Sequence, residues 1–255
     1  MDHLQRVKQE FTRQAEAFAT AAAITDEALS ARFVEAIGSA GHGIILDVAC
    51  GPGIITAALA PKAREVVAFD LTPEMLAKAR QRCAKAGLAN VTFQEGDATR
   101  LPFADHAFDG VVTRLAVHHF EEPPRVFAEM FRVLRPGGTL VVADVVSSEN
   151  AEDSALQNAI ETLRDPSHVR MLARSELVSM LETAGFAVER EATWDKPRGF
   201  EEWMGIVNDD KRAGPLRIVV RALAGAGQHA GMGLALERGE IVFFHRWHMA
   251  VARRP

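Results

Sequence analysis

The sequence of 255 residues contains no tyrosine and only two cysteines, Cys50 and Cys83. Two cysteines without metal-ligand spacing form neither a disulfide framework nor a zinc site, so we expect a reduced protein of the cytoplasm with no bound metal. No apolar run approaches the ~20 residues of a membrane span. The first residues also lack the apolar core of a signal peptide. We therefore expect a cytoplasmic protein without a membrane span.

Positive charge is not in excess either. The chain has 29 Lys and Arg against 34 Asp and Glu, which gives a formal net charge of −5. Because phosphate binding needs a basic face, we expect a small-molecule partner and no nucleic acid. Hydrophobic residues make up 48% of the chain, enough for the core of one α/β domain. The sequence leaves a homodimer open.

The most informative stretch is Ile44 to Gly53, "IILDVACGPG". An apolar run predicts a strand, Gly51 and Gly53 predict a tight turn, and helical character follows. A strand that enters a glycine turn and then a helix is the nucleotide-binding corner of an open α/β sheet. Glycine allows positive φ and carries no Cβ that would keep a ligand away from the backbone. The alternative is a plain strand–turn–helix corner without a ligand.

A dinucleotide site, and with it an NAD-dependent oxidoreductase, is one alternative for this corner. The third glycine of G-x-G-x-x-G would fall at position 56, which is Thr56, and Pro52 stands between the first two glycines. Asp47 at the strand end suits an amine and hydroxyls better than a pyrophosphate, which prefers bare N–H groups. The pattern therefore favours another nucleoside ligand.

Strands and helices alternate from residue 44 to 146, which predicts parallel strands with right-handed crossovers. The predicted strands are Ile44–Val48, Glu65–Phe69, Val91–Gln94, Gly110–Thr113 and Thr139–Val146, and the predicted helices between them include Pro73–Ala86 and Pro123–Leu134. The last strand is apolar throughout apart from Asp144, as expected for a strand buried on both faces.

Three acids follow this alternation. Asp47, Asp70 and Asp97 each stand at the carboxyl end of a successive predicted strand. In a parallel sheet these ends meet along the edge where ligands bind. Asp70 is placed to accept hydrogen bonds from ribose hydroxyls, Asp97 from an adenine amine, and Asp47 from a charged amino group. One such acid alone is more often a solvated loop residue, but three in register indicate a site.

Several motifs together resemble the class I S-adenosylmethionine-dependent methyltransferases. They are "LDVACGPG" (46–53), "VVAFD" (66–70), "GDA" (96–98), "FDGVVTRLAVHHF" (108–120) and "LRPGG" (134–138). The resemblance covers about residues 40 to 150 and is greatest to the small-molecule group that includes the ubiquinone and menaquinone biosynthesis enzymes. It implies an α/β, Rossmann-like three-layer sandwich with N-terminal and inserted cap helices. Its seven-stranded, mostly parallel sheet would have the order 3-2-1-4-5-7-6, with strand seven antiparallel.

The resemblance also implies the cofactor, S-adenosylmethionine. Gly51 and Gly53 would pass beneath its methionine portion, Asp70 would hold the ribose, and Asp97 with Ala98 would hold the adenine. Arg114 takes a position that often contacts the cofactor through its backbone. The full set of implied cofactor residues is Asp47, Ala49, Gly51, Gly53, Asp70, Leu71, Asp97, Ala98 and Arg114.

Residues 1–40 are expected to form two helices. Phe11, Ala15, Phe18 and Ala22 form one apolar stripe, and a second helix, capped by Thr25 or Asp26, carries Leu29, Phe33 and Ile37. Both helices can close over the ligand edge as a lid, although the second could equally cover one face of the sheet.

The rest of the chain is expected to complete the sheet and cap the substrate. The predicted helices are Ala151–Leu163, Ser175–Ala184, Phe200–Val207 and Leu216–Leu223, and the predicted strands are Phe186–Glu191 and Glu240–Val251. We thus expect one domain over residues 1–255, with a lid (1–40), a cofactor-binding core (41–150) and a sheet-completing substrate cap (151–255).

Methyl transfer from a sulfonium is an in-line displacement, for which a protein supplies alignment and excludes water. A base is needed only when the nucleophile arrives protonated. His118 and His119 follow strand four, and Asp144 lies near the end of the neighbouring strand. Our hypothesis is that one histidine acts as a base or orients the substrate, while Asp144 fixes its tautomer. The alternative is that His119 packs beneath the loop and His118 only lines the cleft.

The substrate is expected beneath the segments that roof the sheet edge: the N-terminal helices, His168–Leu172 and Phe200–Met204. Trp194, Trp203 and Met204 could line a pocket for an aromatic or quinone-like acceptor with an O, N or C nucleophile, or they could belong to the core. No Asn/Asp-Pro-Pro-aromatic run follows strand four, which counts against DNA, RNA-adenine and protein-amide targets. A non-catalytic S-adenosylmethionine-binding partner protein is a further alternative.

Overall fold

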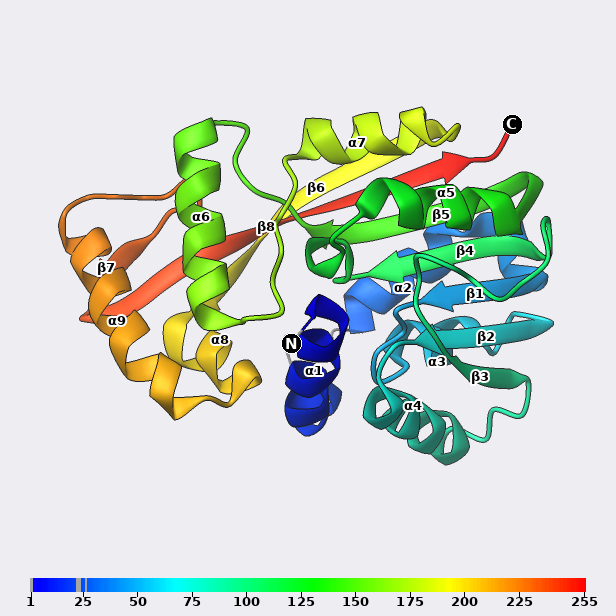
Figure 1. The fold of residues 1–255 in the computed structure, drawn as a ribbon, viewed down its shortest axis with the longest axis horizontal. Coiled ribbons are helices and arrows are strands. Elements are labelled where there is room, and N and C mark those ends of the chain that lie inside the picture. The colour runs from blue at the N-terminus through cyan, green and yellow to red at the C-terminus, as the bar shows by residue number, and fades with distance from the viewer. Residues whose placement is uncertain (1, 22–23, 26) are drawn as a thin grey trace.

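The computed structural model describes residues 2–21, 24–25 and 27–255. Its central feature is an eight-stranded sheet with the order β3-β2-β1-β4-β5-β8-β6, in which β7 pairs with β8 off this path (Figure 1). The five parallel strands are β1 (Ile44–Val48), β2 (Glu65–Asp70), β3 (Val91–Glu95), β4 (Phe108–Arg114) and β5 (Leu134–Val145). All five strands predicted between residues 44 and 146 are confirmed.

The predicted strand order is confirmed, and the predicted number of strands is low by one. β8 (Glu240–Arg253) takes the place of strand seven and runs antiparallel to both β5 and β6 (Ala187–Gly199). The additional strand, β7 (Ala235–Glu237), forms a hairpin with the start of β8. β7 has only three residues, none of them buried, so it carries no alternating pattern that the sequence could show.

Helices cover both faces of the sheet, which confirms the three-layer architecture. On one face, α5 (Pro123–Val133) packs on β5, and α7 (Arg174–Thr183) packs beside it on β6 and β8. On the other face lie α2 (Glu27–Ala36), α3 (Ile54–Leu59) and α4 (Pro73–Lys85). Alternate residues of one strand serve the two faces: Leu46 joins the first core, and Ile45 joins the second.

A second lobe extends from the core sheet along its two longest strands. β8 pairs with β5 only from Trp247 to Arg253, and the first half of β8 continues beyond β5 beside β6 and β7. There α6 (Ala151–Arg164), α8 (Phe200–Val207) and α9 (Asp210–Gly225) pack on the extended strands (Figure 1). This lobe has its own apolar core, made of Ile160, Phe200, Trp203, Met204, Leu216, Val220, Ala230, Met232, Leu234, Ile241 and Phe243.

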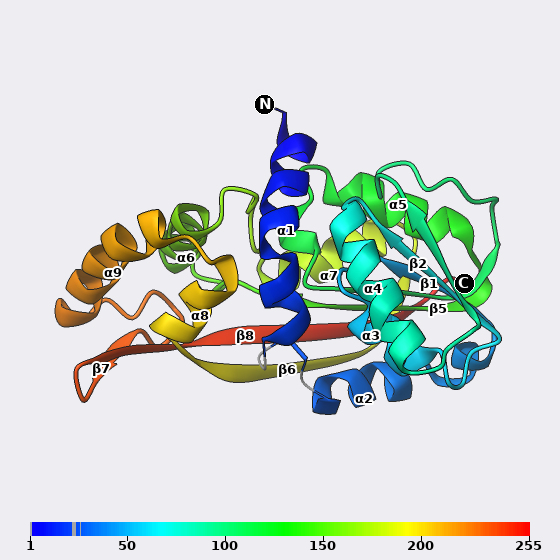
Figure 2. The ribbon, with the colours of Figure 1, turned by 90° about the horizontal axis from the view of Figure 1, so that it is seen from below.

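The N-terminal helix α1 (His3–Thr20) stands between the core sheet and the second lobe, where it contacts α4 and α8 (Figure 2). Helix α2 instead packs Leu29 and Phe33 against the sheet, so the sheet-covering alternative for the second helix is the correct one. Ala22 of the predicted stripe and Asp26, one of the two expected caps, lie outside the described residues. A short 3-10 helix, Gly38–His42, leads into β1.

Candidate active site

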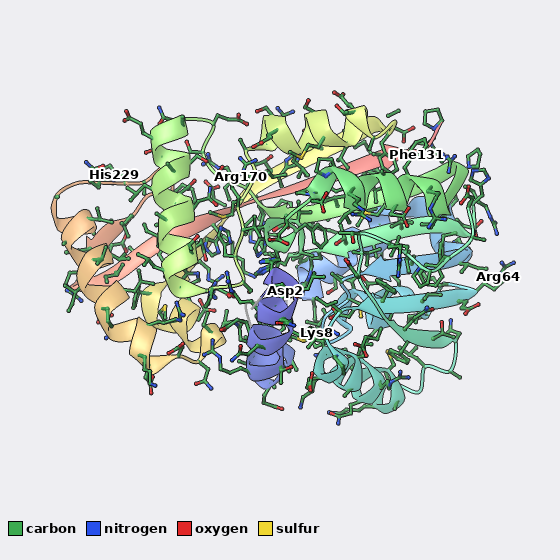
Figure 3. All side chains as sticks on the ribbon, in the orientation of Figure 1. Asp2, Lys8, Arg64, Phe131, Arg170 and His229 are labelled. Atoms are coloured by element: carbon green, nitrogen blue, oxygen red, sulfur yellow. The ribbon has the colours of Figure 1, made fainter. Side chains whose placement is uncertain are left out.

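A cavity of about 890 Å³ opens at the carboxyl edge of the parallel strands. Helix α1 covers it with His3, Leu4, Val7, Phe11 and Phe18. Lys8 on the same helix pairs its ammonium with the carboxylate of Glu95 at the end of β3, 2.8 Å away (Figure 3). The edge that parallel α/β sheets use for ligands is therefore hollow and covered in this protein.

The glycine turn after β1 shapes the floor of this cavity. Gly51 and Gly53 both have positive φ, +54° and +74°. A Cβ on Gly53 would stand 2.7 Å from the Cβ of Ala79 on α4, so this glycine permits the close packing of α3 and α4. A Cβ on Gly51 would meet nothing within 4 Å, and Gly51 lines the cavity. Gly53 does not line the cavity, and its role is to permit the packing of α3 against α4.

Two carboxylates are buried beside the turn. Thr56 donates its hydroxyl to Asp47 at 2.5 Å, and the amides of Gly51 and Thr72 donate to the two oxygens of Asp70 at 2.8 Å each. Burial raises the pKa of Asp47 to about 7, although the hydrogen bond from Thr56 and the charge of Arg114 oppose that shift. Burial likewise raises the pKa of Asp70 to about 6. A bound cation or hydrogen-bond donor would stabilise the ionised form of both carboxylates, because it replaces the hydration that burial removes.

The third acid lines the same cavity. Asp97 accepts the amide and hydroxyl of Thr99 at 2.9 and 2.6 Å, which fixes its carboxylate just after β3. Arg114 at the end of β4 donates a hydrogen bond from its guanidinium to the carbonyl oxygen of Ile24, at 2.9 Å. The predicted cofactor residues that line this one cavity are Asp47, Ala49, Gly51, Asp70, Leu71, Asp97, Ala98 and Arg114.

Of the two histidines after β4, His118 is the one that contacts Asp144. Its Nδ1 lies 2.6 Å from Oδ1 of Asp144, and Oδ2 accepts the amides of Ala116 and Val117 at 3.1 and 2.7 Å. Burial disfavours the imidazolium, but the Asp144 carboxylate overcomes this and raises the pKa of His118. Nε2 of His118 has no hydrogen-bond partner in the described part of the chain. Asp144 therefore fixes both the ring and the loop that carries it.

His119 has a different environment. Its Nδ1 lies 2.9 Å from the carbonyl oxygen of Ser167, and its ring meets Phe11 of α1 edge-on at a centroid distance of 4.8 Å. Burial lowers the pKa of His119 to about 3, so the imidazole is neutral at physiological pH. His119 lines the large cavity, whereas His118 does not.

Buried polar residues lie beside the two histidines: His168 begins a segment that was predicted to roof the sheet edge, whereas Asp165 and Ser167 were not predicted as site residues. His168 lies 5.6 Å from the ring of His118 between centroids, and its Nε2 lies 2.9 Å from Oδ1 of Asn158. Asp165 accepts both the amide and the hydroxyl of Ser167, at 2.8 and 2.6 Å. The available signal was a run of polar residues, "DPSH", that proves to be buried at all but one position.

Of the two alternatives for Trp203 and Met204, a substrate pocket or the core, the core is the correct one. Trp203 and Met204 are 1% and 3% exposed and belong to the core of the second lobe, because α8 turns these side chains against β8. Trp194 stacks on Trp247 at a centroid distance of 5.9 Å, beneath the guanidinium of Arg32.

No group of three or more His, Cys, Asp and Glu side chains within residues 2–21, 24–25 and 27–255 could hold a metal ion. None of the helices in those same ranges has the length and apolarity needed to cross a bilayer.

Residues 46–142 match the family model described as a methyltransferase domain. The uncharacterized methyltransferase YcgJ of Bacillus subtilis is 33% identical over 160 residues, 63% of this chain and 63% of that protein. A Bacillus halodurans structure, described provisionally as a methyltransferase, has a TM-score of 0.83 at 32% identity and covers 89% of this chain and 98% of that one. The demethylmenaquinone methyltransferase of Renibacterium salmoninarum is 40% identical over 111 residues, 44% of this chain and 45% of that protein.

Proposed function

The chain belongs to the class I S-adenosylmethionine-dependent methyltransferases, and we propose that it transfers a methyl group from this cofactor to a small-molecule acceptor by in-line displacement. The observation that carries the proposal is the convergence of three strand-end carboxylates and the Gly51 turn on one cavity of about 890 Å³. The alignment covers less than two thirds of the first curated relative's length.

The residues of the large cavity fit S-adenosylmethionine. That cofactor carries a cationic amine, ribose hydroxyls and an adenine amine, which need acceptors, and Asp47, Asp70 and Asp97 supply them. Gly51 leaves open space where any other residue would place a side chain in the cavity. When bound, the cofactor supplies a methyl group that is already activated on its sulfonium.

Each cofactor residue has an assigned task in this proposal. Asp47 faces the amino group, Gly51 passes beneath the methionine portion, Asp70 accepts the ribose hydroxyls, and Asp97 with Ala98 holds the adenine. Each carboxylate oxygen has a second lone pair, so Asp70 can bind hydroxyls while it keeps its backbone bonds. Ala49, Leu71 and Arg114 complete the wall, and Gly53 shapes the turn from behind.

His118 is proposed as the base where the acceptor arrives protonated. Its Nδ1–H donates to Asp144, which leaves Nε2 able to take the acceptor's proton. The Asp144 carboxylate then stabilises the imidazolium. His119, neutral and set between Ser167 and Phe11, is a positioning residue for the acceptor or for the lid.

The domain organisation follows from these assignments. Residues 1–40 supply the lid through α1, residues 41–150 hold the cofactor, and residues 151–255 complete the sheet and cap the acceptor. We also propose a cytoplasmic enzyme whose partner is a small molecule and not a nucleic acid. A quinone-like or other aromatic acceptor is one candidate, supported by the likeness to a demethylmenaquinone methyltransferase.

Calorimetry with the purified protein tests the cofactor assignment. We expect S-adenosylmethionine and S-adenosylhomocysteine to bind and NAD to give no heat. Binding of NAD alone would support the oxidoreductase alternative and contradict the proposal. A methyl-transfer screen over small O, N and C nucleophiles then separates an enzyme from a cofactor-binding partner protein.

Once the screen yields an acceptor, His118→Ala should lower turnover by about 10²–10⁴-fold, as expected for the loss of a base. The dissociation constant of S-adenosylmethionine should stay the same, because His118 does not line the cofactor cavity. His119→Ala is the matched control and should act mainly on KM. Unchanged turnover in both variants would remove the base from the mechanism.

A further inference from the structure

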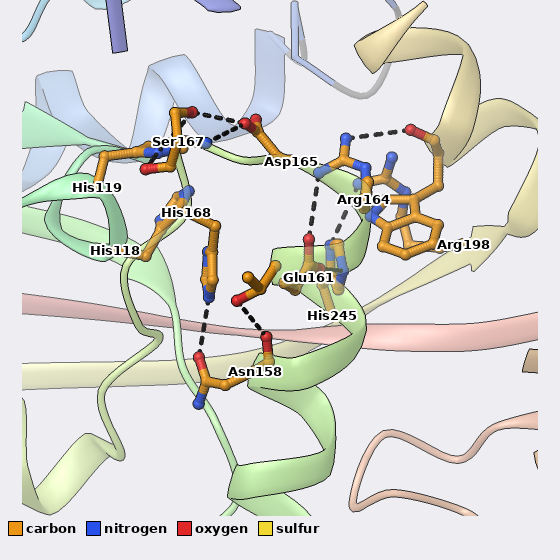
Figure 4. A network of polar contacts seen from close by, with 12 residues as sticks. His118, His119, Asn158, Glu161, Arg164, Asp165, Ser167, His168, Arg198 and His245 are labelled. Carbon is orange, nitrogen blue, oxygen red and sulfur yellow. Dashed lines mark hydrogen bonds and ion pairs between the residues drawn. The ribbon is translucent and has the colours of Figure 1, made fainter. Parts of the chain in front are cut away.

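A second cavity lies behind the loop after β4, between the core sheet and the second lobe. It measures about 50 Å³ and we call it the polar chamber. Figure 4 shows His118 and His168 on one side and Arg164, Arg198 and His245 on the other. Its polar lining residues are His118, Glu161, Arg164, His168, Arg198 and His245.

Each carboxylate oxygen of Glu161 already has a hydrogen-bond partner in this chamber. Its Oε2 accepts from Nη1 of Arg164 at 3.2 Å, and its Oε1 lies 3.0 Å from Nε2 of His245. Nδ1 of His245 in turn lies 3.3 Å from Nη1 of Arg198. A neutral His245 that donates through Nε2 and accepts through Nδ1 satisfies both contacts. Glu161 is thus already paired with two donors, whereas two donors of the same chamber have no partner among the described residues.

Two hydrogen-bond donors of the lining residues, by contrast, have no partner among the described residues. Within the described residues, Nε of Arg164 and Nε1 of Trp247 are buried and have no hydrogen-bond partner. Both residues line the chamber. An unpartnered buried donor is unfavourable, and a guanidinium or an indole can only donate. A ligand with acceptor oxygens would satisfy both groups.

The two arginines of the lining also favour a ligand with negative charge. Arg164 and Arg198 are two cations in the lining, and Glu161 is the single carboxylate there. Glu202 also binds Arg198, through both oxygens at 2.9 and 3.1 Å, but its side chain is 48% exposed, so water screens that pair. Nη1 and Nη2 of Arg164 donate to Glu161 and to the carbonyl oxygen of Trp203, so Arg164 offers a carboxylate its positive charge and one hydrogen bond from Nε.

Size and position connect the chamber to the large cavity. A site needs about 10–15 Å³ for each water-sized group, so about 50 Å³ holds a carboxylate and its adjoining carbons. Phe18 of α1 and Leu115 after β4 line both cavities. A molecule anchored in the chamber would therefore extend past these two side chains toward the cofactor cavity, beside His118.

We propose that the polar chamber binds the carboxylate of the methyl acceptor, so that the substrate is a small organic acid. Arg164 and Trp247 donate to the carboxylate, and the rest of the molecule places its nucleophile near Nε2 of His118. The acceptor role rests on the proposed function, whereas binding of a carboxylate in the chamber can be measured without any methyl transfer.

The test uses acetate, propionate and benzoate against the three matching amides, with protein saturated with S-adenosylhomocysteine. The chain has three tryptophans, so the indole N–H signals in a ¹H–¹⁵N spectrum are few, and Trp247→Phe identifies the one from the chamber. We expect at least one carboxylate to bind saturably, to shift the Trp247 signal, and to bind at least tenfold more tightly than its amide.

Arg164→Gln should weaken carboxylate binding at least tenfold, and Trp247→Phe should weaken it severalfold. Arg217→Gln is the matched control, because Arg217 pairs with Glu201 on the surface of the same lobe. An unchanged dissociation constant for S-adenosylhomocysteine shows that each variant is folded. Equal binding of acids and amides, no saturable binding by any acid, or full binding by Arg164→Gln overturns the proposal. If S-adenosylhomocysteine itself does not bind, the proposed function fails, and the same titration of the free protein still decides the chamber.

Discussion

At the scale of single residues, the buried carboxylate of Asp47 controls how well the large cavity accepts a cation. Burial raises its pKa to about 7, so ionisation occurs within the physiological range. Only the ionised form attracts a positively charged amine or sulfonium. A bound cation therefore favours ionisation, and binding releases a proton below neutral pH.

The affinity for S-adenosylmethionine should rise by about tenfold from pH 6 to pH 8, because a carboxyl group with a pKa near 7 goes from about one tenth to about nine tenths ionised. Calorimetry in two buffers with different ionisation heats measures both the affinity and the released proton. Asp47→Asn should flatten this dependence. An affinity that falls over this pH range would contradict the assignment of the amino group to Asp47.

The two glycines of the turn should respond differently to the same added methyl group. Gly53→Ala places a Cβ 2.7 Å from that of Ala79 at φ +74°, so we expect a loss of about 1–3 kcal/mol in the free energy of unfolding, in the range of overpacked sites. Gly51→Ala should cost less stability, because its Cβ meets nothing, yet it should weaken cofactor binding. Urea unfolding and calorimetry give the two readouts. Equal stability losses would show that backbone strain, not contact with α4, dominates.

The sequence predicted the site residues that stand at the ends of parallel strands. Asp47, Asp70 and Asp97 were found because strand ends of a parallel sheet must meet. Arg164 and Trp247 were not found as site residues, because they come from α6 and β8, and only the pairing of β8 with β5 brings these two elements to the loop after β4.

At the scale of elements, α1 and α2 follow one another in the chain and have different roles. α1 buries Val7 and Ala15, and many of its other contacts are exposed polar links, among them Lys8 with Glu95 and Thr12 with Glu74, both at 2.8 Å. Exposed links of this kind contribute about 0–1 kcal/mol each. α2 buries Leu29 and Phe33 against the sheet. α1 therefore has the smaller free energy of local opening.

Cofactor binding should slow amide hydrogen exchange in α1 at least severalfold, because the bound molecule fills the cavity beneath Val7 and Phe11. The amides of α2 should change little, which makes that helix an internal control. Exchange measured by mass spectrometry with and without S-adenosylhomocysteine gives the answer. Equal protection of the two helices would contradict the role of α1 as the lid.

Element boundaries were predicted well inside the core sheet and less well beyond it. The strand predicted at Phe186–Glu191 continues to Gly199, although most of β6 is exposed and contains Pro197. Its backbone pairs with β8 along almost its whole length, a partner that no local pattern shows. Likewise α9 begins at Asp210, before Pro215, where a proline favours a helix start at Leu216.

At the scale of the whole molecule, β8 joins two apolar cores. Val251 packs in a core of the central sheet, and Phe243 packs in the core of the second lobe. Because one strand belongs to both, disruption of either core is transmitted through its backbone hydrogen bonds. We expect the two lobes to unfold together.

Phe243→Ala should lower the free energy of unfolding by about 3–5 kcal/mol, the usual effect of removing a buried phenylalanine. Urea unfolding followed by circular dichroism should still give a single transition. A first transition that leaves S-adenosylhomocysteine binding intact would show that the second lobe unfolds alone. Leu236→Ala on exposed β7 is the control and should have little effect.

The shared wall of Phe18 and Leu115 has a consequence for inhibitor design. Two compartments that share lining residues invite a single bisubstrate compound, with an adenosine fragment at one end and an acid at the other. Such a compound would gain from joining both fragments by a short linker, since the second fragment binds without a second loss of translational freedom. Homologues with bulkier side chains at these two positions would not bind the bisubstrate compound. The two positions would therefore determine its selectivity.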